Sequence, residues 1–162
     1  MNQDSITGDI MGVTLRQLGA TSIKVINSQM NIVDFELDGG LKVSYVFNIT
    51  KNDKYFLQRM RPYAMTHGKF ANDKDIVEFI KTDITKFRNA SHSSNFQTFL
   101  NISETGNQMV QEMEHLFLNH NVGKETLEDV EQRMEQLIET IHTQYEKSTY
   151  IPIDVENEIK TK

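Results

Sequence analysis

Hydrophobic and polar residues alternate most regularly between residues 33 and 49. The apolar members are Val33, Phe35 and Leu37 in a first run and Leu41, Val43, Tyr45, Phe47 and Ile49 in a second. Successive side chains of a strand point to opposite faces, so the Asp-Gly-Gly segment at 38–40 predicts the turn of a β-hairpin. Residues 22–27 and 54–61 are expected to add two more strands, which completes a four-stranded antiparallel meander. A short helix over residues 9–18 is expected to precede it and to end at Gly19.

From residue 72 onward the apolar residues recur with the period of helices. Ile76, Ile80, Ile84 and Phe87 share one stripe, and Asn72 or Asp73 can cap the first turn. This helix is expected to cover the dry face of the meander. A short helix near Phe96 is expected next, followed by helices over 104–120 and 124–147. The short break between the last two predicts an antiparallel helical hairpin.

The expected fold is therefore α+β: a four-stranded antiparallel meander covered by helices, with a C-terminal antiparallel helical hairpin. The chain has 162 residues with 38% hydrophobic content, which suffices to bury one core. Residues 1–102 are expected to form the sheet-plus-helix domain. Residues 103–147 would form the helical hairpin, packed on that domain or on a second copy, and residues 148–162 an edge strand or a tail. Because two helices cover each other on one side only, we expect a homodimer through residues 104–147 or docking of the hairpin within the chain.

Composition and motifs exclude several classes of protein. The chain has no cysteine, which rules out disulfides, a thiolate nucleophile and a Cys-ligated zinc site. No apolar run approaches the roughly 20 residues that span a bilayer, and the N-terminus lacks the features of a signal peptide. Neither phosphate-binding glycine fingerprint occurs. We therefore expect a cytoplasmic protein with no membrane association, no cofactor and no recognisable catalytic residue.

Two Glu-x-x-His pairs form the only pattern typical of a metal site. Glu112 and His115 lie on one helix of the predicted hairpin, and Glu139 and His142 lie on the other. Di-iron helical bundles use this spacing, but their ligands point into the bundle. At about 100° per residue, both pairs point away from the apolar stripes of their helices. The pattern therefore favours a solvated charged face, and no bound metal is expected.

Charge is distributed unevenly along the chain. Residues 103–162 contain thirteen acidic and five basic residues, a net charge of −8, whereas residues 51–70 contain five basic residues and Asp53, a net charge of +4. Such opposed charges can be satisfied within one chain, between two copies or by a partner. The acidic C-terminal part disfavours general nucleic-acid binding, because it repels phosphates.

The basic segment supplies the candidate site residues, Lys54, Arg59, Arg61 and Lys69. On a regular strand, Arg59 and Arg61 would share one face. That face is then either solvated, with the arginines paired to acidic residues of a neighbouring element, or it receives an acidic protein segment or a small anion. The sequence thus favours a small non-enzymatic interaction or regulatory protein that acts through protein–protein contacts. The alternatives are a ligand-binding domain with an Arg59/Arg61 anion clamp and an enzyme of unrecognised mechanism.

Overall fold

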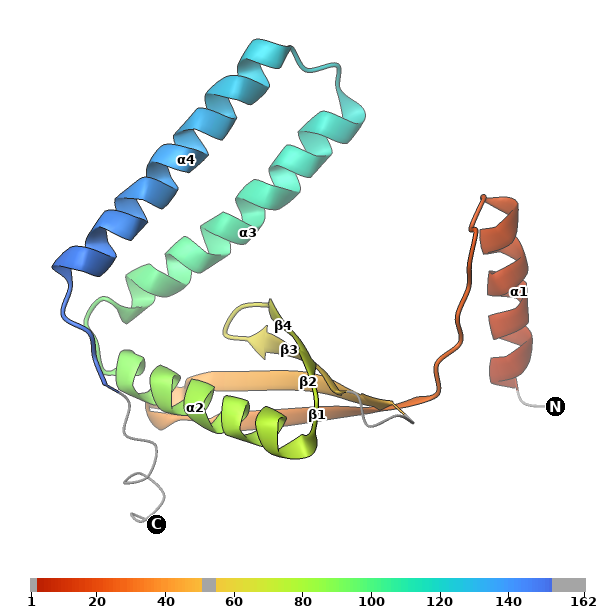
Figure 1. Ribbon diagram of the computed structural model, residues 1–162, viewed down its shortest axis with the longest axis horizontal. Coiled ribbons are helices and arrows are strands. Elements are labelled where there is room, and N and C mark those ends of the chain that lie inside the picture. Colours follow the sequence, from red (N-terminus) through yellow and green to blue (C-terminus); the bar gives the residue numbers. More distant parts are fainter. Residues whose placement is uncertain (1–2, 51–54, 153–162) are drawn as a thin grey trace.

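The computed structural model describes residues 3–50 and 55–152 and contains one antiparallel sheet and four α-helices (Figure 1). In chain order the elements are α1 (Gln3–Gln17), β1 (Ser28–Glu36), the 3-10 turn η1 (Asp38–Gly40), β2 (Lys42–Thr50), β3 (Tyr55–Arg61), β4 (Met65–Phe70), α2 (Asp73–Ser91), α3 (Phe96–Asn119) and α4 (Lys124–Lys147). The α+β class, the four-stranded meander and the helices that follow it are confirmed.

The four strands pair in chain order, β1-β2-β3-β4, each antiparallel to its neighbour. The predicted hairpin is confirmed, with Val33 opposite Tyr45 and Phe35 opposite Val43. Its turn contains two glycines with positive φ, Gly39 at 75° and Gly40 at 79°. Other residues rarely adopt this backbone conformation, which explains why the Gly-Gly pair follows Asp38.

The fourth strand is not the predicted one. Residues 22–27 form no strand, and Val25 is 89% exposed. The sheet is completed instead by β4, in a stretch where the sequence analysis expected no strand. Main-chain pairing with β3 holds β4 in place, and its register shifts next to Gly68, which has a φ of 92°. Strand pairing depends on neighbours distant in sequence, so alternation alone did not distinguish the two segments.

Helix α2 covers one face of the sheet, as predicted. The side chain of Asn72 caps the helix by accepting a hydrogen bond from the backbone N–H of Asp75 at 2.9 Å. The core between α2 and the sheet contains Leu37, Val43, Tyr45, Leu57, Ile76, Ile84 and Phe87. We call this face of the sheet the inner face and the opposite one the outer face.

Helices α3 and α4 form the predicted helical hairpin, which extends away from the sheet (Figure 1). The short helix expected near Phe96 is the first part of α3, so the expected boundary between residues 102 and 103 falls inside one continuous helix. Aromatic rings fix the base of the hairpin: Tyr63 lies 5.7 Å from Phe99 and 6.1 Å from Phe87 between ring centroids. Residues 148–152 have no regular secondary structure, and the rest of the expected edge strand or tail lies outside the described residues.

Helix α1 lies apart from the sheet, at the end of an extended connection (Figure 1). It begins earlier than predicted and ends where expected, since Gly19 has a φ of 97° and donates a backbone hydrogen bond to the carbonyl of Arg16. Ile10, Met11 and Val13 are more than half exposed, and Leu15 is 44% exposed. The side chains of this helix that the structure describes therefore contribute nothing to the core.

Candidate functional site

The structure does not bring the four predicted basic residues together. Arg59 lies on the inner face and is 2% exposed, whereas Arg61 is exposed. Directly opposed residues of an antiparallel pair share a face, and Arg59 lies opposite Tyr45 while Arg61 lies opposite Ser44. The prediction that both arginines share a face is therefore wrong. The cause is a bulge in the β2–β3 pairing, which shifts the alternation by one residue.

Of the remaining two basic residues, the structure describes only Lys69, which is not part of the buried face. Lys69 lies opposite Phe56 and is exposed on the outer face. Lys54 lies outside the described residues. Arg61 and Lys69 therefore share the outer face, where neither has an ion pair with a residue that the structure describes.

Arg59 is bound by a network that joins two strands and α2. Its Nη1 donates to the Oδ2 of Asp83 at 2.7 Å, and the hydroxyl of Tyr45 donates to the same oxygen at 2.7 Å. The carboxylate of Asp83 thus compensates for the burial of the guanidinium charge, and the hydroxyl of Tyr45 adds a hydrogen bond to the same carboxylate oxygen. Arg59 is thus paired with an acidic residue of a neighbouring helix, as one alternative expected, but on a buried face and not on the solvated face that this alternative assumed.

Aromatic rings enclose the same guanidinium. The Cζ atom of Arg59 lies 4.4 Å from the ring centroid of Tyr63 and 4.7 Å from that of Phe87, a typical cation–π arrangement. Its Nη2 lies 3.5 Å from the sulfur of Met65. Only Nε is buried without a hydrogen-bond partner in the described chain. The guanidinium of Arg59 thus has contacts on several sides. Through these contacts the network links the sheet, α2 and the base of the helical hairpin.

The network also alters the titration of nearby groups. Burial and the hydrogen bond to Asp83 raise the pKa of Tyr45 far above its usual range, so its hydroxyl remains a donor at neutral pH. Burial and the positive charge of Arg59 lower the pKa of His67, whose ring lies 4.5 Å from that of Phe79. A buried phenol with a raised pKa cannot act as a base at neutral pH, and neutral His67 has its Nε2 buried. Both pKa shifts therefore result from packing in and around the core.

Sequence reasoning missed Asp83, although a signal was present. Asp83 lies seven residues after Ile76 and four before Phe87, so it continues the apolar stripe of α2. An acidic residue at such a position must find a cation or a hydrogen-bond donor in the core. That requirement, together with basic residues on a neighbouring strand, would have predicted the Arg59–Asp83 pair.

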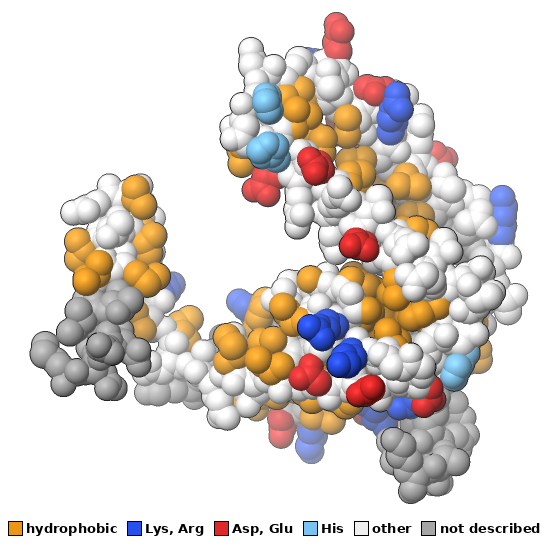
Figure 2. Space-filling view, turned by 180° about the vertical axis from the view of Figure 1, so that it is seen from behind, with side chains coloured by type: hydrophobic (Ala, Val, Ile, Leu, Met, Phe, Trp, Pro, Cys, Tyr) orange, Lys and Arg blue, Asp and Glu red, His pale blue; other side chains and the backbone are white. Residues whose placement is uncertain are grey.

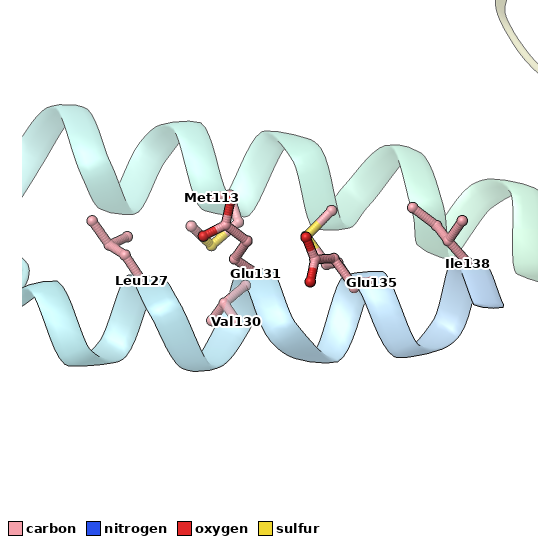
Figure 3. A pocket seen from close by; sticks show the side chains of 7 residues that line it. Met113, Leu127, Val130, Glu131, Glu135 and Ile138 are labelled. Atoms are coloured by element: carbon pink, nitrogen blue, oxygen red, sulfur yellow. The ribbon is translucent and has the colours of Figure 1, made fainter. Parts of the chain in front are cut away.

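The helical hairpin contains the second candidate site. An open groove of about 440 Å³ lies between α3 and α4, lined by Met113, Leu127, Val130, Glu131, Met134, Glu135 and Ile138. Figure 3 shows Leu127, Glu131 and Ile138 extending from α4 into the space between the helices. The floor is apolar, and Glu131 and Glu135 have no ion pair with a described residue.

Apolar exposure distinguishes the helical hairpin from an ordinary helical pair. Each helix has 24 residues, yet neither has a buried residue. Phe117, Leu137 and Ile138 are all more than half exposed. Seen from behind, hydrophobic side chains run along the hairpin and acidic ones border them (Figure 2). Isolated apolar residues at a surface are ordinary, whereas large contiguous apolar patches are typical of interaction sites.

Other chemistry finds little support in the described residues. No group of three or more His, Asp or Glu side chains within 3–50 and 55–152 is arranged to hold a metal ion, and both Glu-x-x-His pairs are exposed. None of the helices in these ranges combines the length and apolarity that a bilayer crossing requires. No protein-family model, curated protein or solved structure matched the chain.

Proposed function

We propose that this protein is a small non-enzymatic interaction protein that acts through protein–protein contacts of its helical hairpin. The exposed apolar stripe of α3 and α4 carries the proposal, because neither helix buries a residue. Exposing this much apolar surface to water is unfavourable, by roughly 25 cal/mol for each Å² that a partner would cover. A partner that covers the stripe therefore gains free energy from a surface that already exists.

The packing at the base of the hairpin supports the same function. The ring of Phe99 contacts that of Tyr63, which in turn stacks on the buried Arg59. These contacts give the hairpin a firm attachment to the sheet while its far end remains uncovered. A binding surface that is held in place before the partner arrives loses less conformational entropy on association.

We also propose that the partner is a protein in the cytoplasm and not a nucleic acid. The chain carries a net charge of −6, and residues 104–147 contain ten acidic and three basic residues. Phosphate backbones are repelled by such a surface. The lack of cysteine agrees with a reducing compartment.

The test is cross-linking in an extract of the native host, followed by mass spectrometry that locates the cross-linked residues. The Leu137→Gln/Ile141→Gln variant removes two exposed apolar side chains of the stripe. We expect it to lose the cross-links on α3 and α4 while its melting temperature stays unchanged. The control is Ile26→Gln/Val77→Gln, which alters two similarly exposed apolar positions outside the hairpin. Equal loss in both variants, or no cross-links on the hairpin of the wild type, contradicts the proposal.

A further inference from the structure

The outer face of the sheet is a second uncovered apolar surface. Met30 lies opposite Asn48 and Asn48 opposite Phe56, while Ile32 lies opposite Val46 in the next row. These pairings place Met30, Ile32, Val46 and Phe56 together, and we call them the outer patch. Met30 is 66% and Ile32 67% exposed, so no described element covers this side of the sheet.

Basic side chains border the outer patch. Lys69 lies beside Phe56 across the β3–β4 pair, and Arg61 ends β3. The outer face also contains two acidic residues: Glu36 lies opposite Lys42, and Asp34 accepts a hydrogen bond from Ser44. The described basic residues of this face, Lys42, Arg61 and Lys69, outnumber them, and neither Arg61 nor Lys69 has an ion pair with a described residue.

The groove of the helical hairpin has the opposite charge. Its apolar floor is bordered by Glu131 and Glu135, and the ten acidic residues over 104–147 outnumber the basic ones by seven. Two such helical hairpins brought face to face would repel each other, because like charges are disfavoured in an interface. The apolar stripe thus fits a surface that combines exposed apolar side chains with positive charge.

We propose that the helical hairpin of one copy docks on the outer patch of a second copy. This inference rests on the proposed function and names its partner. Each copy has both surfaces, one apolar with acidic residues and one apolar with basic residues, and the fold leaves both uncovered. Glu131 and Glu135 pair with Arg61 and Lys69 of the other copy, while the apolar side chains of both surfaces pack together. Two reciprocal contacts close a dimer.

The two surfaces also match in length. At about 1.5 Å per residue, helices of this length span roughly 36 Å. Strands of seven to nine residues span about 23–30 Å at roughly 3.3 Å per residue. A reciprocal contact uses both surfaces of each copy, and stable complexes typically cover about 800 Å² per partner.

Charge exchange between two variants tests the proposal. The first variant, Arg61→Glu/Lys69→Glu, makes the border of the outer patch acidic, and the second, Glu131→Lys/Glu135→Lys, makes the border of the groove basic. All four side chains are exposed, so the fold should tolerate the changes. Size exclusion with light scattering at tens of micromolar gives the mass, and the monomer has 18.8 kDa.

The wild type is expected to associate, and its apparent affinity should fall as salt is raised. Each variant alone brings like charges together and should associate about tenfold or more weakly. An equimolar mixture of the two should associate again, because every contact between unlike copies is complementary. Should either charge reversal lower the melting temperature, the neutral variants Arg61→Gln/Lys69→Gln and Glu131→Gln/Glu135→Gln must weaken association in the same direction.

Matched controls change the same number of charges elsewhere. Lys74→Glu/Lys86→Glu alters exposed positions of α2, and Glu125→Lys/Glu139→Lys alters exposed positions that lie about 120–160° from Leu127 around α4. Both should associate like the wild type. A monomeric wild type, or association that survives in Arg61→Glu/Lys69→Glu, overturns the inference. The proposed function fails separately, when the hairpin of the wild type forms no cross-link with any protein, a second copy of the chain included.

Discussion

The sheet with α2 and the helical hairpin place their apolar residues in opposite ways. The sheet and α2 enclose seven buried hydrophobic residues and the Arg59–Asp83 pair, whose side chains are 3% and 13% exposed. The helical hairpin buries no residue, and its Arg133–Asp129 pair is exposed. The same kinds of interaction, apolar packing and ion pairs, therefore have different energetic weight in the two regions.

This difference predicts which substitutions should affect folding and which should affect association. Substitutions of the buried residues between the sheet and α2 should lower the free energy of unfolding, since they leave cavities or unpaired charges in a dry environment. Substitutions on the helical hairpin should change association and leave folding nearly unaffected, since water already reaches the side chains. Within residues 3–50 and 55–152, the core between the sheet and α2 thus holds the structure, whereas the helical hairpin leaves its apolar side chains in contact with water.

Removing the carboxylate that neutralises the buried arginine should have the largest effect. Asp83→Ala leaves the guanidinium of Arg59 buried and unpaired, which should lower the free energy of unfolding by about 3–5 kcal/mol. The corresponding change in the helical hairpin, Asp129→Ala, breaks an exposed ion pair and should cost about 0.5 kcal/mol. Urea unfolding followed by circular dichroism measures both values.

Replacing both partners of the buried pair provides the control. Arg59→Met/Asp83→Leu removes the charges together and fills the space with apolar side chains, so it should recover much of the stability lost in Asp83→Ala. Equal losses in Asp83→Ala and Asp129→Ala would contradict the distinction between the two regions.

Truncating one apolar side chain in each region makes the same comparison without changing any charge. Leu57 is fully buried, and Leu57→Ala should lower the free energy of unfolding by about 2–5 kcal/mol. Ile138 is 51% exposed in the groove, and Ile138→Ala should lower it by about 0.5 kcal/mol or less. Light scattering should show the reverse order, with association weakened in Ile138→Ala and preserved in the folded fraction of Leu57→Ala. Similar unfolding losses in the two variants would mean that the helical hairpin belongs to the core.

The sequence predicted the elements whose pattern is local. Alternation around residues 38–40 identified the β1–β2 hairpin, and the stripe from Ile76 to Phe87 identified the buried face of α2. Glycines with positive φ marked the ends of α1 and of β1, since their conformations exclude most other residues. Periodicity and turn residues depend on near neighbours, which the sequence contains directly.

Features that depend on distant neighbours were not predicted. The bulge between β2 and β3 reversed the face of Arg61, and the choice of β4 over residues 22–27 depended on pairing with β3. Strand alternation also could not show that the core would enclose Arg59, because its partner Asp83 lies 24 residues away on α2. The sequence therefore did not predict how these basic residues are arranged, and the role of Arg61 and Lys69 in binding a partner stays a prediction.

The smallest effect concerns pH and the edge of the buried region. Burial and Arg59 lower the pKa of His67 in the folded chain, while Asp83 opposes this in part. In the unfolded chain the histidine binds a proton near pH 6.5, whereas the folded chain keeps it neutral until lower pH. The unfolded state then binds more protons, so the free energy of unfolding should be unaffected by this group above about pH 6.5 and should fall as the pH drops below it.

Replacing His67 tests this assignment. His67→Phe keeps a ring against Phe79 and removes the titrating group, so the part of the acid sensitivity due to His67 should disappear. A shallower dependence of the unfolding free energy on pH just below about 6.5 is therefore expected for the variant. In the wild type, the NMR signal of the His67 ring should titrate with a midpoint below about 6.5. A midpoint at about 6.5 would mean that the ring is solvated, and a higher one that Asp83 outweighs burial and Arg59; either result contradicts this assignment.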